Sequence, residues 1–328
     1  MRRVEERDAP LHDYTENIWG IWNMQSKLKL YGFNNLTKSL SFNIYDVCYA
    51  KSPREQRDYI AYIDEQYNSE RLTKILFHVT KMIGAHVLNV SKQDYEPQGA
   101  SVTFLIAESN MIPAGQKSAA SAALSYQESL LPSNKDGKIN NGSDDRNDKQ
   151  GCEQKDAYNY CNCDCYGNDE LVAHLDKSHI TVHTYPEYHP ETNIATFRVD
   201  IDVATCGEIT PLSTLDFLIG SFDSDIITMD YRVRGFTRNV EGKKIFIDHT
   251  ITSIQDYIDK VTLDKYDAID INMYQANIFH TKMLIKEIDL QNYLFNSDIY
   301  EITPKTRLQI SNSLRQEMIE IFSGANIF

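Results

Sequence analysis

The sequence has no apolar run that approaches the roughly 18 residues a membrane-spanning helix requires. Its first residues also have no apolar segment after the two arginines, so we expect no secretory signal peptide. Positive charge is in deficit: 33 Lys and Arg stand against 47 Asp and Glu, and the formal net charge is −14. A field of that sign repels nucleic acid and anionic membranes. We therefore expect a cytoplasmic protein that binds neither.

Cysteine is also too sparse for a disulfide framework, with six residues in a chain of 328. We interpret these cysteines as reduced thiols. Three of them alternate along Cys161–Cys165, which differs from the two-residue spacing of structural zinc sites. Incidental thiols are therefore the preferred interpretation of this cluster, and binding of a soft metal is the alternative.

Apolar residues, in contrast, are plentiful: 41% of the chain is hydrophobic and 11% is aromatic. This composition is sufficient for one large domain or two smaller ones. Residues 1–26 are polar and predict an N-terminal extension. Residues 109–169 are rich in Ser, Asn, Asp, Gly and Lys and predict a long, largely disordered insertion. The insertion interrupts an α+β core expected over residues 27–240, and residues 241–328 predict a mostly helical C-terminal region.

Hydrophobic periodicity predicts the elements of this core. The expected strands begin at Lys27–Tyr31 and continue with Val87–Val90, Ala100–Ala107, His179–His183, Ala195–Val203 and Ile226–Val233. One expected helix starts at Ser52-Pro53, and a helical apolar face runs from Leu72 to Ile83 and ends at Gly84. Further helices are expected over Pro211–Phe222, Ile251–Lys260 and Asn272–Glu287, and a final helix opens at Thr303-Pro304. This order predicts a mainly antiparallel sheet with helices packed on it, an α+β sandwich with a helical C-terminal extension.

Three side chains are candidates for chemistry, and inert packing is the alternative for each. Ser178 stands where the polar insertion ends and a strand begins. His179 and His183 share one face of that strand but are roughly 13 Å apart, too far to chelate one metal ion. His183 could instead act as an acid or a base. Cys206 precedes Gly207 at the end of a strand and could donate a proton or act as a nucleophile. These residues by themselves do not define a reaction.

The segment Leu175–Glu187 closely resembles the processing site of bacterial S-adenosylmethionine decarboxylases. Other segments resemble the long-chain, enterobacterial-type branch of that family: Lys27–Thr37, Tyr95–Thr103, Asp230–Arg238 and Asn277–Met283. These motifs occur in matching order over about residues 27–323, apart from the insertion.

The resemblance implies a proenzyme that cuts its own backbone between Lys177 and Ser178. In this family the serine hydroxyl attacks the preceding carbonyl, the resulting ester breaks by β-elimination, and the new N-terminus becomes a pyruvoyl group. The products would be a β chain, residues 1–177, and an α chain that starts at modified Ser178. His183 matches the proton acceptor of this processing reaction, and Ser101 is a further candidate for a processing residue.

The implied activity is decarboxylation of S-adenosylmethionine to the aminopropyl donor for spermidine synthesis. The pyruvoyl group forms a Schiff base with the substrate amine and serves as the electron sink. Cys206 matches the catalytic proton donor, and Glu187 matches a residue that holds the nucleoside ribose. The branch also uses a divalent cation, typically magnesium, and assembles as a homo-oligomer of αβ units. Candidate metal ligands are Asp200, Asp202 and Glu208.

Two other functions stay open at this point. A processing-defective relative could serve as a regulatory or binding subunit, although the joint presence of Ser178, His183 and Cys206 argues against it. A Ser or Cys hydrolase that uses His183 would leave the chain intact, and the sequence has no Gly-x-Ser-x-Gly elbow.

Overall fold

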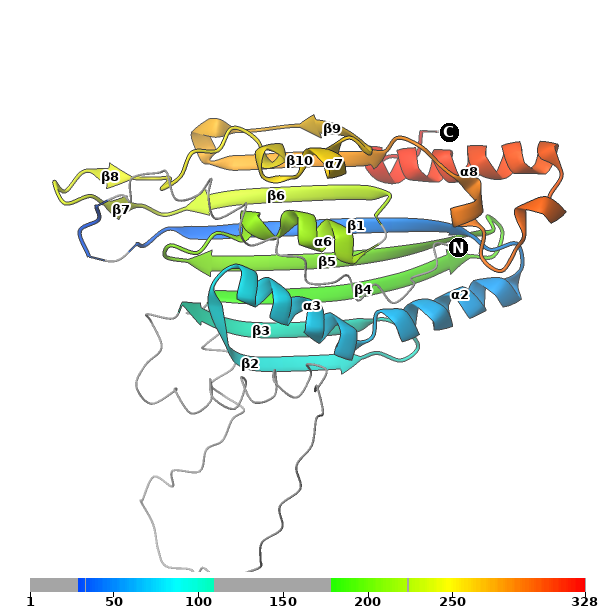
Figure 1. The fold of residues 1–328 in the computed structure, drawn as a ribbon, viewed down its shortest axis with the longest axis horizontal. Helices are drawn as coiled ribbons and strands as arrows, with labels where there is room; N and C mark the ends of the chain where they lie inside the picture. The colour runs from blue at the N-terminus through cyan, green and yellow to red at the C-terminus, as the bar shows by residue number, and fades with distance from the viewer. Residues whose placement is uncertain (1–28, 33, 109–177, 223, 328) are drawn as a thin grey trace, which may run out of the picture.

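Eight antiparallel strands form the sheet on which the rest of the molecule packs (Figure 1). The computed structural model describes residues 29–32, 34–108, 178–222 and 224–327, so the predicted N-terminal extension and insertion lie outside it. Across the sheet the order is β2-β3-β4-β5-β1-β6-β10-β9. Its strands are β1 (Thr37–Tyr49), β2 (Ala85–Asp94), β3 (Ala100–Glu108), β4 (Ser178–His189), β5 (Ile194–Cys206), β6 (Ile226–Arg234), β9 (Tyr266–Asp270) and β10 (Ile278–Ile285).

Period-two alternation gives this sheet one apolar face. Leu40, Phe42 and Ile44 of β1 are at most 1% exposed, whereas the residues between them are partly exposed. The neighbouring strands β4, β5 and β6 alternate in the same way. The mainly antiparallel α+β architecture expected from the sequence is therefore confirmed.

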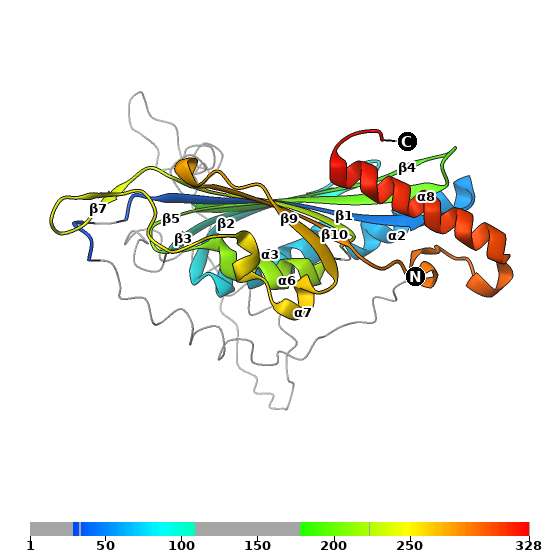
Figure 2. The same cartoon turned by 90° about the horizontal axis from the view of Figure 1, so that it is seen from above.

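The apolar face is covered by helices α2 (Pro53–Gln66), α3 (Ser69–Met82) and α6 (Leu215–Ser221), which lie on the same side in Figure 2. The start of α2 is confirmed, because the Ser52 side chain accepts a hydrogen bond from the Glu55 backbone and Pro53 occupies the first turn. Shorter helical elements are η2 (Pro211–Thr214), η3 (Ile254–Tyr257), α7 (Lys260–Leu263), η4 (Tyr274–Ala276), η5 (Leu290–Tyr293) and η6 (Ile299–Glu301).

The opposite face of the sheet is covered at one end by α8 (Pro304–Ser323), as Figure 2 shows. This helix packs on β1, β6 and β10 and buries Ile310, Leu314 and Met318. It confirms the predicted final helix. In the described part of the chain, no helix is both long and apolar enough to cross a membrane.

Several expected elements of the C-terminal third are wrong. The expected helix Asn272–Glu287 contains strand β10, in which Phe279, Thr281 and Met283 alternate as buried residues against β6. Sheet pairing therefore overrides the helical spacing of this segment. A continuous helix over Ile251–Lys260 is also absent from the described residues there, where only η3 and the start of α7 form. Strands β9 and β10 share the sheet with the core, and the domain boundary near residue 240 stays a prediction.

The N-terminal boundary of the sheet also differs from the sequence-based expectation. Leu30 forms only an isolated bridge with Asn239, and the first strand begins at Thr37. Asn239 follows β7 (Thr237–Arg238), which pairs with β8 (Lys244–Ile245) in a separate two-stranded ribbon. The segment before β1 therefore packs on this ribbon rather than in the main sheet.

Candidate active site

Ser178 and Cys206 meet at one end of the sheet. Ser178 opens β4 and Cys206 ends β5, and because these strands are antiparallel neighbours the two residues lie side by side. The Ser178 Oγ atom lies 3.4 Å from the Cys206 Sγ atom and accepts the backbone N–H of Cys206 at 3.1 Å. Ser178 is buried, with 6% of its surface exposed, whereas Cys206 is partly exposed. Two candidates singled out separately in the sequence thus form one site.

The turn after Cys206 is fixed by hydrogen bonds from side chains on the apolar face of the sheet. Gly207 has a φ of +76°, a backbone conformation that favours glycine. Its carbonyl accepts a hydrogen bond from Lys38 Nζ at 2.9 Å. Thr205 Oγ1 donates to the carbonyl of Ile209 at 3.1 Å. Side chains from the apolar face therefore fix the backbone that carries the thiol.

Lys38 belongs to a buried polar network that the sequence analysis missed. Its side chain is 2% exposed, and its ammonium nitrogen lies 2.7 Å from Asp248 Oδ2. The same carboxylate accepts Asn34 Nδ2 at 2.6 Å and lies 2.7 Å from His249 Nδ1. His249 Nε2 lies 3.2 Å from the hydroxyl of buried Tyr231. One signal was available: Lys38 shares the alternation register of the apolar β1 residues, where a charge requires a partner.

The electrostatics of this network keep Asp248 ionised. Burial acts to raise the pKa of the carboxyl, but the hydrogen bond from His249 and the charge of Lys38 outweigh it and hold the pKa well below its ordinary value. Burial also raises the pKa of Tyr231 well above the ordinary value, so this phenol stays neutral. The network is therefore an ion pair whose two members each have at least one further hydrogen bond.

His183 and Glu187 do not lie beside Ser178 in the same chain. His183 is five residues along β4 and Glu187 is nine, which at a strand rise of about 3.3 Å places them roughly 16 and 30 Å from Ser178. Both point to the face opposite the apolar core, as does Ser101, the cross-strand neighbour of His183. Ser101 Oγ lies 2.7 Å from the hydroxyl of Tyr95.

The three candidate metal ligands do not form a metal site. Asp200 accepts Asn43 Nδ2 at 2.6 Å and pairs with Arg198 at 3.0 Å, and Asp202 accepts the Ser41 hydroxyl. Within the described ranges, no group of three or more His, Cys, Asp or Glu side chains could hold an ion. Asp200 and Asp202 are thus engaged by side chains of the sheet, and magnesium binding stays a prediction. Lys177 and the cysteine cluster at 161–165 lie outside the described residues.

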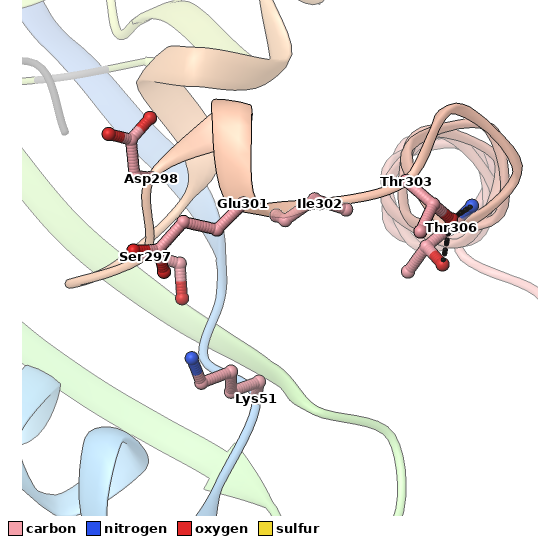
Figure 3. A pocket seen from close by; sticks show the side chains of 7 residues that line it. All are labelled: Lys51, Ser297, Asp298, Glu301, Ile302, Thr303 and Thr306. Carbon is pink, nitrogen blue, oxygen red and sulfur yellow. Dashed lines mark hydrogen bonds between the residues drawn. The ribbon is translucent and has the colours of Figure 1, made fainter.

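A cavity of about 250 Å³ lies at the other end of the sheet (Figure 3). Lys51, just beyond the end of β1, faces it from one side, and side chains between Ser297 and Thr306 line the other. Cys206 pairs with Thr37 at the start of β1. By strand rise, the two ends of β1 are roughly 40 Å apart, so the cavity lies about that distance from Cys206. The cavity is thus separate from the site at Ser178.

Comparison with known proteins gives consistent matches. The family described as S-adenosylmethionine decarboxylase matches residues 167–235. A protein of Clostridium botulinum named S-adenosylmethionine decarboxylase proenzyme is 67% identical over 93% of this chain and 98% of its own length. Proteins of the same name from Clostridium beijerinckii and Heliobacterium modesticaldum are 65% and 54% identical, over 93% and 92% of this chain and 99% and 97% of their own lengths.

A solved structure of the adenosylmethionine decarboxylase from Aquifex aeolicus is also similar, at 14% identity and a TM-score of 0.28. It covers 67% of this chain and 99% of its own.

Proposed function

This chain belongs to the S-adenosylmethionine decarboxylase family, and we propose that it matures by cutting its backbone before Ser178 and then decarboxylates S-adenosylmethionine. The product is the aminopropyl donor for spermidine synthesis. The relatives are named proenzymes, which supports a maturation step. The observation that carries the assignment of residues is the double contact of the Ser178 hydroxyl with the thiol and the backbone N–H of Cys206.

The surroundings of Ser178 fit a residue that becomes the prosthetic group. A pyruvoyl group formed there supplies the electron sink that decarboxylation of an α-amino acid requires. Before cleavage, the hydrogen bond from the Cys206 N–H restrains the position of the Ser178 oxygen, and restraint of a nucleophile favours its reaction. The burial of Ser178 limits access of water to the reacting bond.

Cys206 is the proton donor of the turnover step in this proposal. Its thiol is the side-chain acid in contact with the position of Ser178. Its partial exposure allows the thiol to regain a proton from water after each turnover. A positioned general acid of this kind contributes about 10²- to 10⁴-fold to a rate.

We assign the processing role of His183 to a second copy of the chain. The roughly 16 Å along β4 exceeds hydrogen-bond reach within one chain. His183 and Glu187 share the face that α8 leaves partly open, and a second copy placed against this face could receive both side chains. Ser101, opposite His183, would act from the same copy. The proposal thus includes a homo-oligomer of αβ units, in which Glu187 holds the ribose of a substrate bound at the neighbouring Ser178.

Mixing tests this assignment. Chains with Ser178→Ala and chains with His183→Ala, carrying different tags, should each stay intact when produced alone. Co-expression should restore cleavage of the His183→Ala chain only, because the other chain supplies the histidine. A mixed oligomer in which no chain is cleaved would place the base within one chain or assign it to another residue.

The function itself is tested by mass and by carbon dioxide. Intact-mass measurement should find two fragments, residues 1–177 and an α chain from residue 178 with a blocked N-terminus. The cleaved protein should release labelled carbon dioxide from carboxyl-labelled S-adenosylmethionine. A single full-length species after long incubation at neutral pH would contradict the proposal.

Two further expectations have different support. The cytoplasmic location stays part of the proposal, and the free thiols of Cys48 and Cys206 are compatible with it. Magnesium has no support from the described residues, and no step is assigned to it.

A further inference from the structure

The Lys38 network lies next to the reactive pair without contributing a reacting atom. Lys38 projects from β1 into the apolar face, between the helices and the sheet, where it is 2% exposed. A buried ammonium group is stable only when its charge is paired and its N–H groups are satisfied. Here the pairing comes from Asp248 at 2.7 Å and from the Gly207 carbonyl at 2.9 Å. Displacing either partner therefore leaves a buried charge incompletely compensated.

Asp248 cannot easily turn away from Lys38, because other groups hold it. Asn34 donates to the same oxygen as Lys38, and His249 binds the second oxygen. His249 is in turn held by the buried Tyr231 hydroxyl on β6. The network therefore joins the start of β1, the centre of β6 and the loop before η3 at one place below the end of β5.

The Gly207 carbonyl connects the Lys38 network to the backbone that carries the Cys206 thiol. Gly207 follows Cys206 directly and has no side chain that could anchor the turn by itself. Lys38 fixes its carbonyl, and Thr205 Oγ1 fixes the carbonyl of Ile209. Cys206 touches Ser178 through both its N–H and its thiol, so a shift of about 1 Å in this turn would weaken both contacts.

We propose that Lys38, anchored by Asp248, is a positioning residue that holds the Cys206-Gly207 turn against Ser178 for both self-cleavage and turnover. The inference rests on the proposed function, since it assigns Lys38 a part in the maturation and turnover of that site. It differs from a role in folding alone, because loss of Lys38 should slow chemistry in molecules that are folded.

Lys38→Met removes the ammonium group and keeps the length of the side chain. Its first-order rate of proenzyme cleavage, followed on denaturing gels, should fall by about 10-fold or more. The kcat per pyruvoyl group, titrated with a carbonyl reagent, should fall by a similar factor while KM stays within about twofold. Lys38→Gln keeps an N–H donor for the Gly207 carbonyl and should recover part of both rates.

Two controls separate positioning from other effects. Lys282 also donates from its ammonium to a backbone carbonyl, that of Phe322 at 2.8 Å, and Lys282→Met should leave cleavage and kcat unchanged. Cys206→Ala keeps the backbone N–H and should lose turnover but retain cleavage. If Lys38→Met slows both cleavage and turnover, its effect comes from displacement of the Cys206-Gly207 turn and not from loss of the thiol's proton alone.

A double variant, Lys38→Met with Asp248→Leu, covers the case in which the single variant does not fold. Replacing a whole buried ion pair by apolar residues often preserves stability, and the proposal expects slow cleavage in this folded double variant. Normal cleavage and normal kcat in either folded variant would overturn the proposal. Failure of the wild-type chain to cleave at Ser178 would instead contradict the proposed function.

Discussion

The two described thiols, Cys48 and Cys206, lie at opposite ends of the β1–β5 pair, and their surroundings differ. Cys48, near the end of β1, is 8% exposed and its Sγ lies 3.5 Å from the carbonyl of Tyr293. Burial, followed by the charge of Asp46, raises the pKa of this thiol well above its ordinary value. Cys206 is partly exposed and touches the Ser178 hydroxyl. The same residue type is thus a buried packing element at one end and, in the proposed function, the proton donor at the other.

Each end also has a buried or nearly buried aspartate, and the two differ in their partners. Asp225 accepts the Tyr293 hydroxyl at 2.6 Å and the Val47 backbone N–H at 2.9 Å, which join β1 to the segment before α8. Asp248 pairs with the Lys38 ammonium. The first set of contacts secures packing, whereas the second secures the backbone beside Ser178. Environment rather than residue type therefore distinguishes the end of the sheet that carries Ser178.

The largest expected effect comes from Ser178→Ala. Without the hydroxyl, no ester can form, so both cleavage and decarboxylation should be abolished. Denaturing gels and intact mass should find one chain of full length, and release of carbon dioxide should fall to background. Production of the two fragments by this variant would move the reactive centre elsewhere.

The two thiols should respond differently to the same substitution. Cys206→Ala should lower kcat by about 10²-fold or more, as expected for loss of a general acid, while cleavage continues. Cys48→Ala should leave kcat unchanged and cost about 1 kcal/mol of stability, through the small cavity it creates. Steady-state kinetics measure kcat, and thermal melts measure stability. An equal fall in kcat in Cys206→Ala and Cys48→Ala would contradict the assignment of different roles to the two thiols.

Asp248→Asn should destabilise the fold by about 3 kcal/mol at pH 7, because it leaves the buried Lys38 without its anion. The folded pKa of Asp248 lies below its value in the unfolded chain, so the stabilisation is complete above about pH 4 and is lost as the pH falls further. Urea unfolding should be measured on the uncleaved Ser178→Ala chain with and without Asp248→Asn. The difference between their free energies of unfolding should become smaller below that pH.

The matched control is Asp58→Asn, which removes an exposed pair with Arg54 on α2. It should change stability by less than about 0.5 kcal/mol. A loss as large as that of Asp248→Asn would mean that burial of the Lys38 pair is not what makes it strong.

The smallest effect is expected at Glu317 on α8, over the end of the sheet remote from Ser178. Burial first, and then the charges of Glu320 and Glu187, raise the pKa of this half-buried carboxyl. A raised folded pKa means that ionisation costs stability above it, so Glu317→Gln should be slightly more stable at pH 7. Solvent screening limits the gain to a few tenths of a kcal/mol. The melting temperatures of the wild-type chain and Glu317→Gln should differ at pH 7 and should be equal at pH 4.

Some features of this protein follow from short stretches of sequence. The Ser52-Pro53 helix start, the alternation of β3, β4 and β5, and the final helix from Thr303-Pro304 were predicted, because caps and periodicity depend on residues a few positions apart. Strand β1 was not predicted. The family resemblance, which includes the motif around Ser178, led to the proposal of Ser178 as the reactive serine and nominated His183 and Cys206.

Other features depend on strand register and burial across the whole chain. The apolar spacing of 272–287 fits a helix, but pairing with β6 makes it a strand. Ser178 and Cys206, 28 positions apart, meet through the β4–β5 pairing, whereas His183, only five positions from Ser178, does not reach it. Lys38 and Gly207 are 169 positions apart, and Asn34 and Asp248 are 214 apart. Local sequence nominated the residue that we propose as reactive, and the tertiary structure decided which groups surround and hold it, because those contacts form only when distant segments are packed together.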